Sequence, residues 1–152
     1  MTDFWNKRYS EDKYVYGKLP NEFLAEQLKK LKPGKILFAC EGEGRNAVYA
    51  ASKGWETYAF DSSLAGKDKA DDLAKKLKVF IDYKLSSAEN ANYDDQSFDA
   101  VVFIYAHLPE DIRKPLHQKA VKWLKPKGVL ILEAFNKKQL ANSSGGPKNA
   151  AM

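Results

Sequence analysis

The hydrophobic positions of this chain gather in short runs, and between the runs apolar and polar residues mix at helical spacing. Five runs are rich in apolar residues without a strict alternation of polar ones, at residues 36–40, 56–60, 79–83, 100–105 and 129–135. Strands that are apolar on both faces are typical of a parallel sheet covered by helices on both sides. The pattern therefore predicts five buried strands.

Four stretches with apolar residues at helical spacing are predicted to be helices, over about residues 22–31, 45–53, 63–77 and 110–124. Asn21 is expected to cap the first, Ser62 or Ser63 the third, and Gly54 to end the second. Strands that alternate with helices and connect by right-handed crossovers give a doubly wound α/β fold. We expect a Rossmann-like parallel sheet in three layers, with strand order 3-2-1-4-5.

The chain is expected to form a single domain over residues 1–152, because this length provides one substantial core but hardly two. Residues 1–20 are aromatic and polar without clean periodicity and are interpreted as an N-terminal arm or lid. Residues 21–138 are the expected core, and residues 139–152 form a loop-like tail.

Charge and cysteine content limit the possible partners. The net charge is +5 with a sequence pI near 9.1, but the lysines, Lys67 and Lys69 among them, are interleaved with acids such as Asp68 and are expected on solvated surfaces. We therefore expect no nucleic-acid partner. The single Cys40 fits a reducing cytoplasm and leaves no cluster for a metal. No apolar run approaches the ~20 residues of a membrane span, so no membrane partner is expected.

The loop Glu41–Gly44 lies between the first predicted strand and the helix that begins at Arg45. Glycine lets a ligand approach the main chain closely, and the following helix offers free N–H groups to an anion. A short Gly-x-Gly is also compatible with a purely structural tight turn. Its position at the end of the first strand favours a binding loop.

Asp61 ends the second predicted strand, about twenty residues beyond the loop. Dinucleotide-binding folds place an acid there on the ribose hydroxyls, since a carboxylate can accept hydrogen bonds from both. The alternative role is to cap the next helix, which Ser62 or Ser63 could do instead.

Around these positions the sequence resembles the class I S-adenosylmethionine-dependent methyltransferases, and especially the small bacterial branch related to tellurite-resistance and thiopurine methyltransferases. The matching text is Phe4-Trp5-Asn6 with Arg8-Tyr9, then Tyr16-Gly17, then ILFACEGEGRNAVYAASKGWETYAFDSS over residues 36–63, SFDAVV over 97–102 and LKPKGVLILEAF over 124–135. The order and spacing of these blocks carry the resemblance.

The resemblance implies that S-adenosylmethionine is the cofactor and that a small molecule is the methyl acceptor. It assigns cofactor contacts to Tyr16, Glu41, Gly42, Gly44, Arg45, Asp61, Ser62, Ser87, Ala88 and Tyr105. The arm residues Trp5, Arg8, Tyr14 and Tyr16 are candidates for a lid, or else pack as ordinary surface. Three positions depart from the family pattern: Phe38 replaces an acid, Cys40 the first glycine, and Ser87 an aspartate.

The catalytic residue is unknown, because methyl transfer needs mainly alignment and exclusion of water. His107 is a weak candidate base, with a hydrogen-bonded structural role as the alternative. The stretch Ile104–His107 lacks the Asn/Asp-Pro-Pro-aromatic motif of adenine methyltransferases, which argues against a nucleic-acid base as acceptor.

The family's sheet has two more strands, for which this chain has no sequence left. We therefore expect a truncated chain with an exposed sheet edge that a second copy could cover, and impaired turnover is then possible. Two other functions stay open: a non-catalytic nucleoside-binding or assembly module and, less favoured, an NAD-dependent oxidoreductase, since Gly42, Gly44 and Ala47 also fit a degenerate dinucleotide loop.

Overall fold

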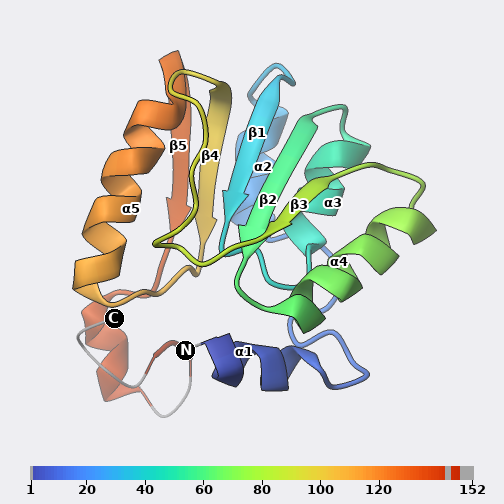
Figure 1. Ribbon diagram of the computed structural model, residues 1–152, viewed down its shortest axis with the longest axis vertical. Helices are drawn as coiled ribbons and strands as arrows, with labels where there is room; N and C mark the ends of the chain where they lie inside the picture. Colours follow the sequence, from blue (N-terminus) through green and yellow to red (C-terminus); the bar gives the residue numbers. More distant parts are fainter. Residues whose placement is uncertain (1, 143–144, 148–152) are drawn as a thin grey trace.

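The computed structural model describes residues 2–142 and 145–147. Its centre is one sheet of five parallel strands in the order β3-β2-β1-β4-β5 (Figure 1). The strands are β1 (Lys35–Ala39), β2 (Glu56–Asp61), β3 (Asp82–Leu85), β4 (Phe98–Ile104) and β5 (Leu124–Glu133). The predicted fold class and strand order are confirmed.

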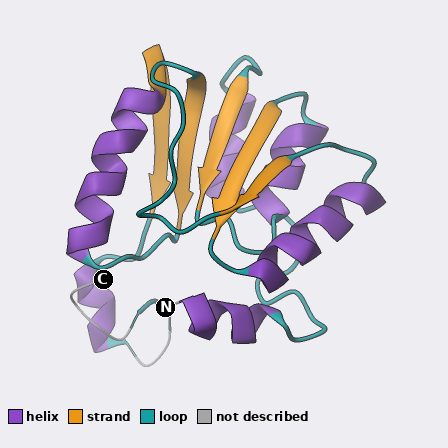
Figure 2. Ribbon diagram, in the orientation of Figure 1, coloured by secondary structure: helices purple, strands orange, loops and turns teal. Residues whose placement is uncertain are grey.

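Helices cover both faces of the sheet (Figure 2). They are α1 (Thr2–Tyr9), α2 (Glu22–Lys29), α3 (Arg45–Ser52), α4 (Leu64–Lys76) and α5 (Glu110–Trp123), followed by the 3-10 helix η1 (Lys137–Ala141). Buried residues of α2, α3 and α4 share one hydrophobic core, whereas α5 and residues 88–91 share a second core on the other face. No helix in the described ranges is long and apolar enough to cross a membrane.

Strand β1 explains why the central runs are apolar throughout. Ile36 and Phe38 belong to the core under α2, α3 and α4, whereas Leu37 and Ala39 belong to the core under α5. Successive side chains of a strand point to opposite faces, and here both faces are dry. A polar residue in this run would be buried on one side or the other.

Two predicted caps are present. The Asn21 side chain accepts a hydrogen bond from the Leu24 N–H at 2.9 Å, at the start of α2. Ser63, and not Ser62, caps α4 by accepting from the Gly66 N–H at 3.1 Å. Gly54, with a φ of +90°, follows α3 as predicted.

Some predicted boundaries were wrong. The third strand begins at Asp82 and not at Val79. Val79 and Ile81 pack into the core without pairing, and the pairing with β2 starts only at Tyr58 and Asp82. The fifth strand begins at Leu124, so that the turn predicted at residues 126–128 lies inside the strand. There it forms a bulge between the paired residues Phe98–Leu124 and Ala100–Val129. The strand also ends at Glu133, before the predicted 135.

Regular structure also occurs where none was predicted. The arm contains α1, and η1 extends into the segment predicted as a loop-like tail from residue 139. Residues 143–144 and 148–152 of that tail lie outside the described residues. Both helices bury little side-chain surface of their own, with Tyr9 the one buried residue of α1 and none in η1.

The Ser97–Val102 block of the resemblance has a structural role at the amino end of the sheet. Asp99 accepts hydrogen bonds from the Lys35 N–H at 2.7 Å and from the Lys125 ammonium at 2.9 Å. These bonds hold the pKa of Asp99 below its usual value. Asp99 therefore ties the start of β1 to β4 and β5, away from the end of the sheet where a ligand is expected.

Candidate functional site

The predicted binding loop and the predicted ribose acid meet where β1 and β2 end. The Gly42 N–H donates to Asp61 Oδ2 at 3.0 Å, and the Ser63 N–H donates to Asp61 Oδ1 at 2.9 Å. Asp61 is buried, which raises the pKa of its carboxyl, while these backbone bonds act in the opposite direction. The structure thus brings Gly42 and Asp61 together, and Asp61 also takes part in the turn that leads into α4.

The two loop glycines face the protein's own atoms. A Cβ on Gly42 would lie 2.6 Å from the Tyr9 hydroxyl, and one on Gly44 would lie 2.8 Å from the Ala70 Cα. Both glycines also have positive φ, +62° and +82°. Packing against α1 and α4 therefore already requires glycine here, and on these sides of the loop Tyr9 and Ala70 take the space that the sequence argument reserved for a ligand.

Glu41 stabilises the start of α3. Its Oε1 accepts hydrogen bonds from the Asn46 N–H at 2.9 Å and the Ala47 N–H at 2.8 Å, where the N-cap residue Gly44 has no side chain to do so. Burial raises the pKa of Glu41 to about 7, against the lowering effect of these bonds. Of the predicted cofactor residues, Glu41 thus has a capping role.

Glu43 and Lys69 fasten the N-terminal arm to this loop, and sequence reasoning missed both. The Lys69 ammonium lies 2.8 Å from Glu43 Oε1, and Glu43 Oε2 accepts from the Val15 N–H at 2.7 Å. Lys69 also donates to the Glu11 and Lys13 carbonyl oxygens. The expectation that Lys69 lies on a solvated surface was wrong, because its side chain reaches from α4 into the arm.

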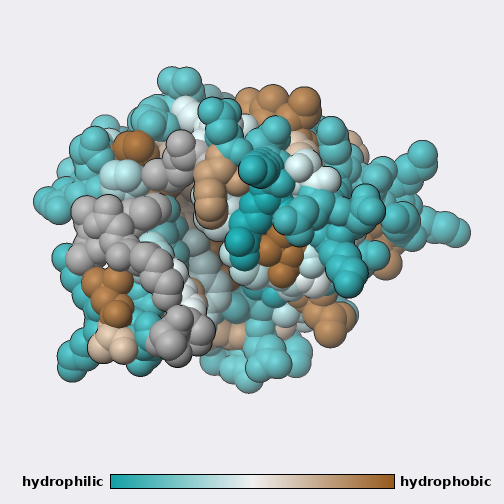
Figure 3. All heavy atoms as spheres, turned by 90° about the horizontal axis from the view of Figure 1, so that it is seen from below, coloured by the Kyte–Doolittle hydropathy of each residue, from teal (hydrophilic) through white to brown (hydrophobic). Residues whose placement is uncertain are grey.

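A second anchor joins α1 to the amino end of α4. The Asn6 side-chain oxygen accepts from the Ser63 hydroxyl at 3.1 Å and from the Ala65 N–H at 3.0 Å. Trp5 stacks on Tyr9, with ring centroids 5.4 Å apart. The arm therefore lies across the carboxyl ends of the strands, on the side seen in Figure 3, where hydrophobic side chains form small separate patches among hydrophilic ones.

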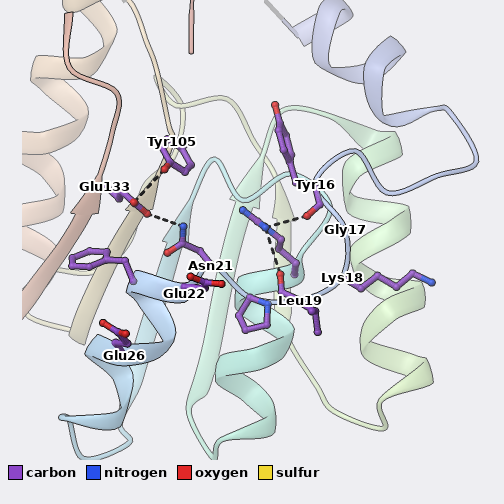
Figure 4. A pocket seen from close by; sticks show the side chains of 12 residues that line it. Tyr16, Gly17, Lys18, Leu19, Asn21, Glu22, Glu26, Tyr105 and Glu133 are labelled. Carbon is purple, nitrogen blue, oxygen red and sulfur yellow. Dashed lines mark hydrogen bonds between the residues drawn. The ribbon is translucent and has the colours of Figure 1, made fainter. Parts of the chain in front are cut away.

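A cavity of about 830 Å³ lies beside the loop, between the end of the arm, the start of α2 and the ends of β4 and β5 (Figure 4). Its lining is formed by residues 16–23 together with Glu26, Arg45, Tyr105 and Glu133. Three predicted cofactor residues line it: Tyr16, Arg45 and Tyr105. Arg45 donates to the Tyr16 carbonyl oxygen at 3.0 Å and so holds the end of the arm at the rim.

Tyr105 follows β4 in a strained conformation. Its φ of +53° lies in the left-handed region, as does that of Cys40 (+55°) at the end of the neighbouring β1. Such conformations cost of order 1 kcal/mol or more and gather at functional sites. The Tyr105 hydroxyl donates to Glu133 Oε1 at 3.1 Å, which keeps the ring at the cavity.

Both ring nitrogens of His107 are engaged with the main chain. The Phe135 N–H donates to Nε2 at 3.1 Å, so Nδ1 carries the proton that is shared with the Tyr105 carbonyl oxygen at 3.0 Å. Burial lowers the pKa of His107 below its usual value. This geometry favours the structural role for His107 over that of a base.

The remaining predicted residues lie near Asp61. The Ser86 N–H donates to the Asp61 carbonyl oxygen at 2.9 Å, which brings the loop with Ser87 and Ala88 beside the end of β2. Ala88 is buried in the core under α5, and the Ser87 hydroxyl accepts from the Asn90 N–H at 3.3 Å. Ser62 is half-buried between Asp61 and the cap Ser63. In the described part of the chain no three His, Cys, Asp or Glu side chains are grouped to hold a metal ion.

Comparison with known proteins gives one family. Residues 36–128, well over half of the chain, match the model of a methyltransferase domain. A comparison with curated proteins finds no match.

Three similar solved structures extend the comparison. A protein from Pyrococcus horikoshii OT3 is 26% identical, with a TM-score of 0.66 over 72% of this chain and 51% of its own. TehB from Haemophilus influenzae is 19% identical, with a TM-score of 0.67 over 86% of this chain and 44% of its own. Phosphoethanolamine N-methyltransferase 1 from Haemonchus contortus, solved with phosphoethanolamine and S-adenosylhomocysteine, is 16% identical, with a TM-score of 0.74 over 99% of this chain and 35% of its own. The chain thus spans about half the length, or less, of these structures.

Proposed function

Since the chain belongs to the methyltransferase domain family, we propose that it binds S-adenosylmethionine and transfers the methyl group to a small-molecule acceptor. The observation that carries this proposal is the meeting of Gly42 and Asp61 where the neighbouring strands β1 and β2 end. Neither of these residues lines the cavity of about 830 Å³, but Arg45, directly after the loop, does. Ligands of open parallel sheets bind outside the carboxyl ends of the strands. Small-molecule sites commonly have volumes of about 300–1,000 Å³.

The residues around the loop fit such a cofactor. Each Asp61 oxygen accepts one backbone hydrogen bond and keeps a lone pair that can accept from a ribose hydroxyl. Arg45 uses one guanidinium nitrogen on carbonyl oxygens, which leaves donors for the carboxylate of a methionine moiety. Tyr105 offers an exposed aromatic ring at the cavity, which suits a positively charged sulfonium.

S-adenosylmethionine supplies a methyl group that its sulfonium sulfur activates for in-line displacement. The chain's own residues then have to align the two reactants and exclude water. Tyr105, fixed by its bond to Glu133, and the arm up to Tyr16, fixed by Arg45, enclose the cavity from two sides. A dedicated base is not required by this chemistry, in keeping with the engaged ring of His107.

Thermal denaturation with added ligands tests the proposal. S-adenosylmethionine and S-adenosylhomocysteine should raise the midpoint, because a ligand that binds only the native state stabilises it by about 2.7 kcal/mol at a hundred times its Kd. Asp61→Asn should weaken binding about tenfold to a hundredfold, since a hydrogen bond to a charged acceptor contributes about 1.5–3 kcal/mol. Each variant is compared with its own ligand-free midpoint, and Asp68→Asn, on the exposed side of α4, is the control that should bind normally.

Other outcomes of this measurement separate the remaining functions. A shift with NAD and none with the two methyltransferase ligands would replace the proposal by an oxidoreductase. No shift with any of them would favour the non-catalytic module. An undiminished shift in Asp61→Asn would remove Asp61 from the site.

We further propose membership of the small bacterial branch related to tellurite-resistance and thiopurine methyltransferases, supported by the matching blocks from Phe4 to Phe135. A cytoplasmic location is part of the proposal and is supported by the free thiol of Cys40.

The outer edge of β5 is the proposed contact with a second copy of the chain. In the described ranges β5 pairs with β4 alone, and Leu130 and Leu132 are 41% and 42% exposed. Unpaired strand edges with apolar side chains tend to associate. Light scattering after gel filtration should give a dimer mass for the parent protein and a monomer mass for the double variant Leu130→Lys and Leu132→Lys, with Val121→Lys on α5 as a dimeric control. A monomeric parent at all concentrations would contradict the dimer.

A further inference from the structure

The chemistry of the cavity lining differs from that of the protein as a whole. The chain has a net charge of +5, yet three carboxylates line this cavity: Glu22 and Glu26 on α2 and Glu133 at the end of β5. Figure 4 shows the three on one side of the cavity. Among the described residues none of them forms an ion pair. The two hydrogen bonds that Glu133 accepts, from Tyr105 and Asn21, come from neutral donors.

The two cationic residues of the lining form no ion pair with these carboxylates. Arg45 donates to the Tyr16 and Leu19 carbonyl oxygens, and its guanidinium lies 5.8 Å from the centre of the Tyr16 ring. The Lys18 ammonium lies 4.8 Å from the centre of the Tyr14 ring, and its side chain points away from the carboxylates in Figure 4. The glutamate side of the cavity is therefore negative, whereas the Arg45 side offers positive charge.

Aromatic rings stand on the same side as the carboxylates. Phe23 and Tyr105 are 37% and 38% exposed and both line the cavity. Tyr105 is held there by its bond to Glu133 and by a left-handed backbone. Aromatic faces together with carboxylates that form no ion pair suit an organic ammonium group, because both attract its positive charge.

We propose that the part of the cavity between Glu26, Glu133 and Tyr105 binds an organic ammonium group, and that the methyl acceptor is a molecule that carries one. The identification of this ligand as the acceptor rests on the proposed function. The binding of a cation at these residues stands independently of it.

Three probes that share a phenethyl group test the charge preference: phenethylamine, 2-phenylethanol and 3-phenylpropionate. Calorimetry or chemical-shift titration of the full chain should show the amine binding about tenfold or more tightly than the alcohol, with the propionate weakest. Raising the salt concentration should reduce this advantage. Equal binding of the amine and the alcohol, or tighter binding of the propionate, would overturn the proposal.

Charge-neutralising variants locate the site. Glu133→Gln and Glu26→Gln should each weaken the amine about threefold to tenfold and leave the alcohol unchanged, because each removes one negative charge and keeps the size of the side chain. Glu110→Gln on α5, outside the cavity, is the matched control. Unchanged amine affinity in both cavity variants would overturn the proposal. Titrating the amine in the absence of S-adenosylmethionine tests the cation site independently of the proposed function. If the protein binds the amine but does not bind S-adenosylmethionine, the cation site stands and the proposed methyltransferase function fails.

Discussion

Replacement of Gly44 by alanine is expected to destabilise the protein by about 2–5 kcal/mol. Two effects add: an alanine at a φ of +82° is strained, and its Cβ would lie 2.8 Å from the Ala70 Cα, where only backbone movement could relieve the contact. The loss in the free energy of unfolding is measured from the midpoint and slope of a denaturant unfolding curve.

Gly54→Ala is the matched control for this prediction. Gly54 also has a positive φ, +90°, but a Cβ there meets nothing within 4 Å. Its replacement is expected to cost about 1–2 kcal/mol, the conformational part alone. Equal losses at both positions would show that α3 and α4 do not approach each other as closely as described.

Replacement of Lys69 by methionine is expected to cost about 3–5 kcal/mol, because it leaves the Glu43 carboxylate buried without its partner. Glu43 is 4% exposed, and the Lys69 side chain 17%. The arm should also become sensitive to proteolysis around residues 11–15, since Lys69 holds two carbonyl oxygens there. Urea unfolding and limited proteolysis are the two measurements.

Two further variants isolate the buried charge as the cause. Lys67→Met breaks an exposed pair with Asp71 on the same helix and should cost only about 0.2–0.5 kcal/mol. The double variant Glu43→Gln and Lys69→Met should be more stable than Lys69→Met alone, because no bare charge remains inside. A loss below 1 kcal/mol for Lys69→Met would mean that water reaches Glu43.

The strands that carry the site were predictable where both of their faces are buried. In β1 and β4 every position except Lys35 and Asp99 is apolar, and these runs of apolar residues can be recognised directly in the sequence. At the edge strand β3 the same signal misled, because Val79 and Ile81 are apolar for packing and not for pairing. Helix α1 escaped notice since its helical face buries one side chain, Tyr9, which leaves no periodicity to detect.

Within the site, the sequence could predict the contacts that follow from the fold itself. It could not predict the contacts that are particular to this chain. The approach of Gly42 to Asp61 follows from two strands that end side by side. The pairing of Glu43 with Lys69 joins a loop to a helix 26 residues later, and a lysine among aspartates looks like any solvated helix. The carboxylates of the cavity come from α2 and β5, more than a hundred residues apart, so that only the folded chain reveals their common side.

The ion pair at Glu43 has a mechanical consequence. Glu43 is the neighbour of Gly42 in the loop, its other oxygen holds Val15 of the arm, and Lys69 belongs to α4. Three segments thus meet at one carboxylate, and a displacement of any of them pulls on the other two. Entry of a ligand past the arm would therefore move the loop and the first turns of α4 together with the arm, because the arm cannot move independently of them.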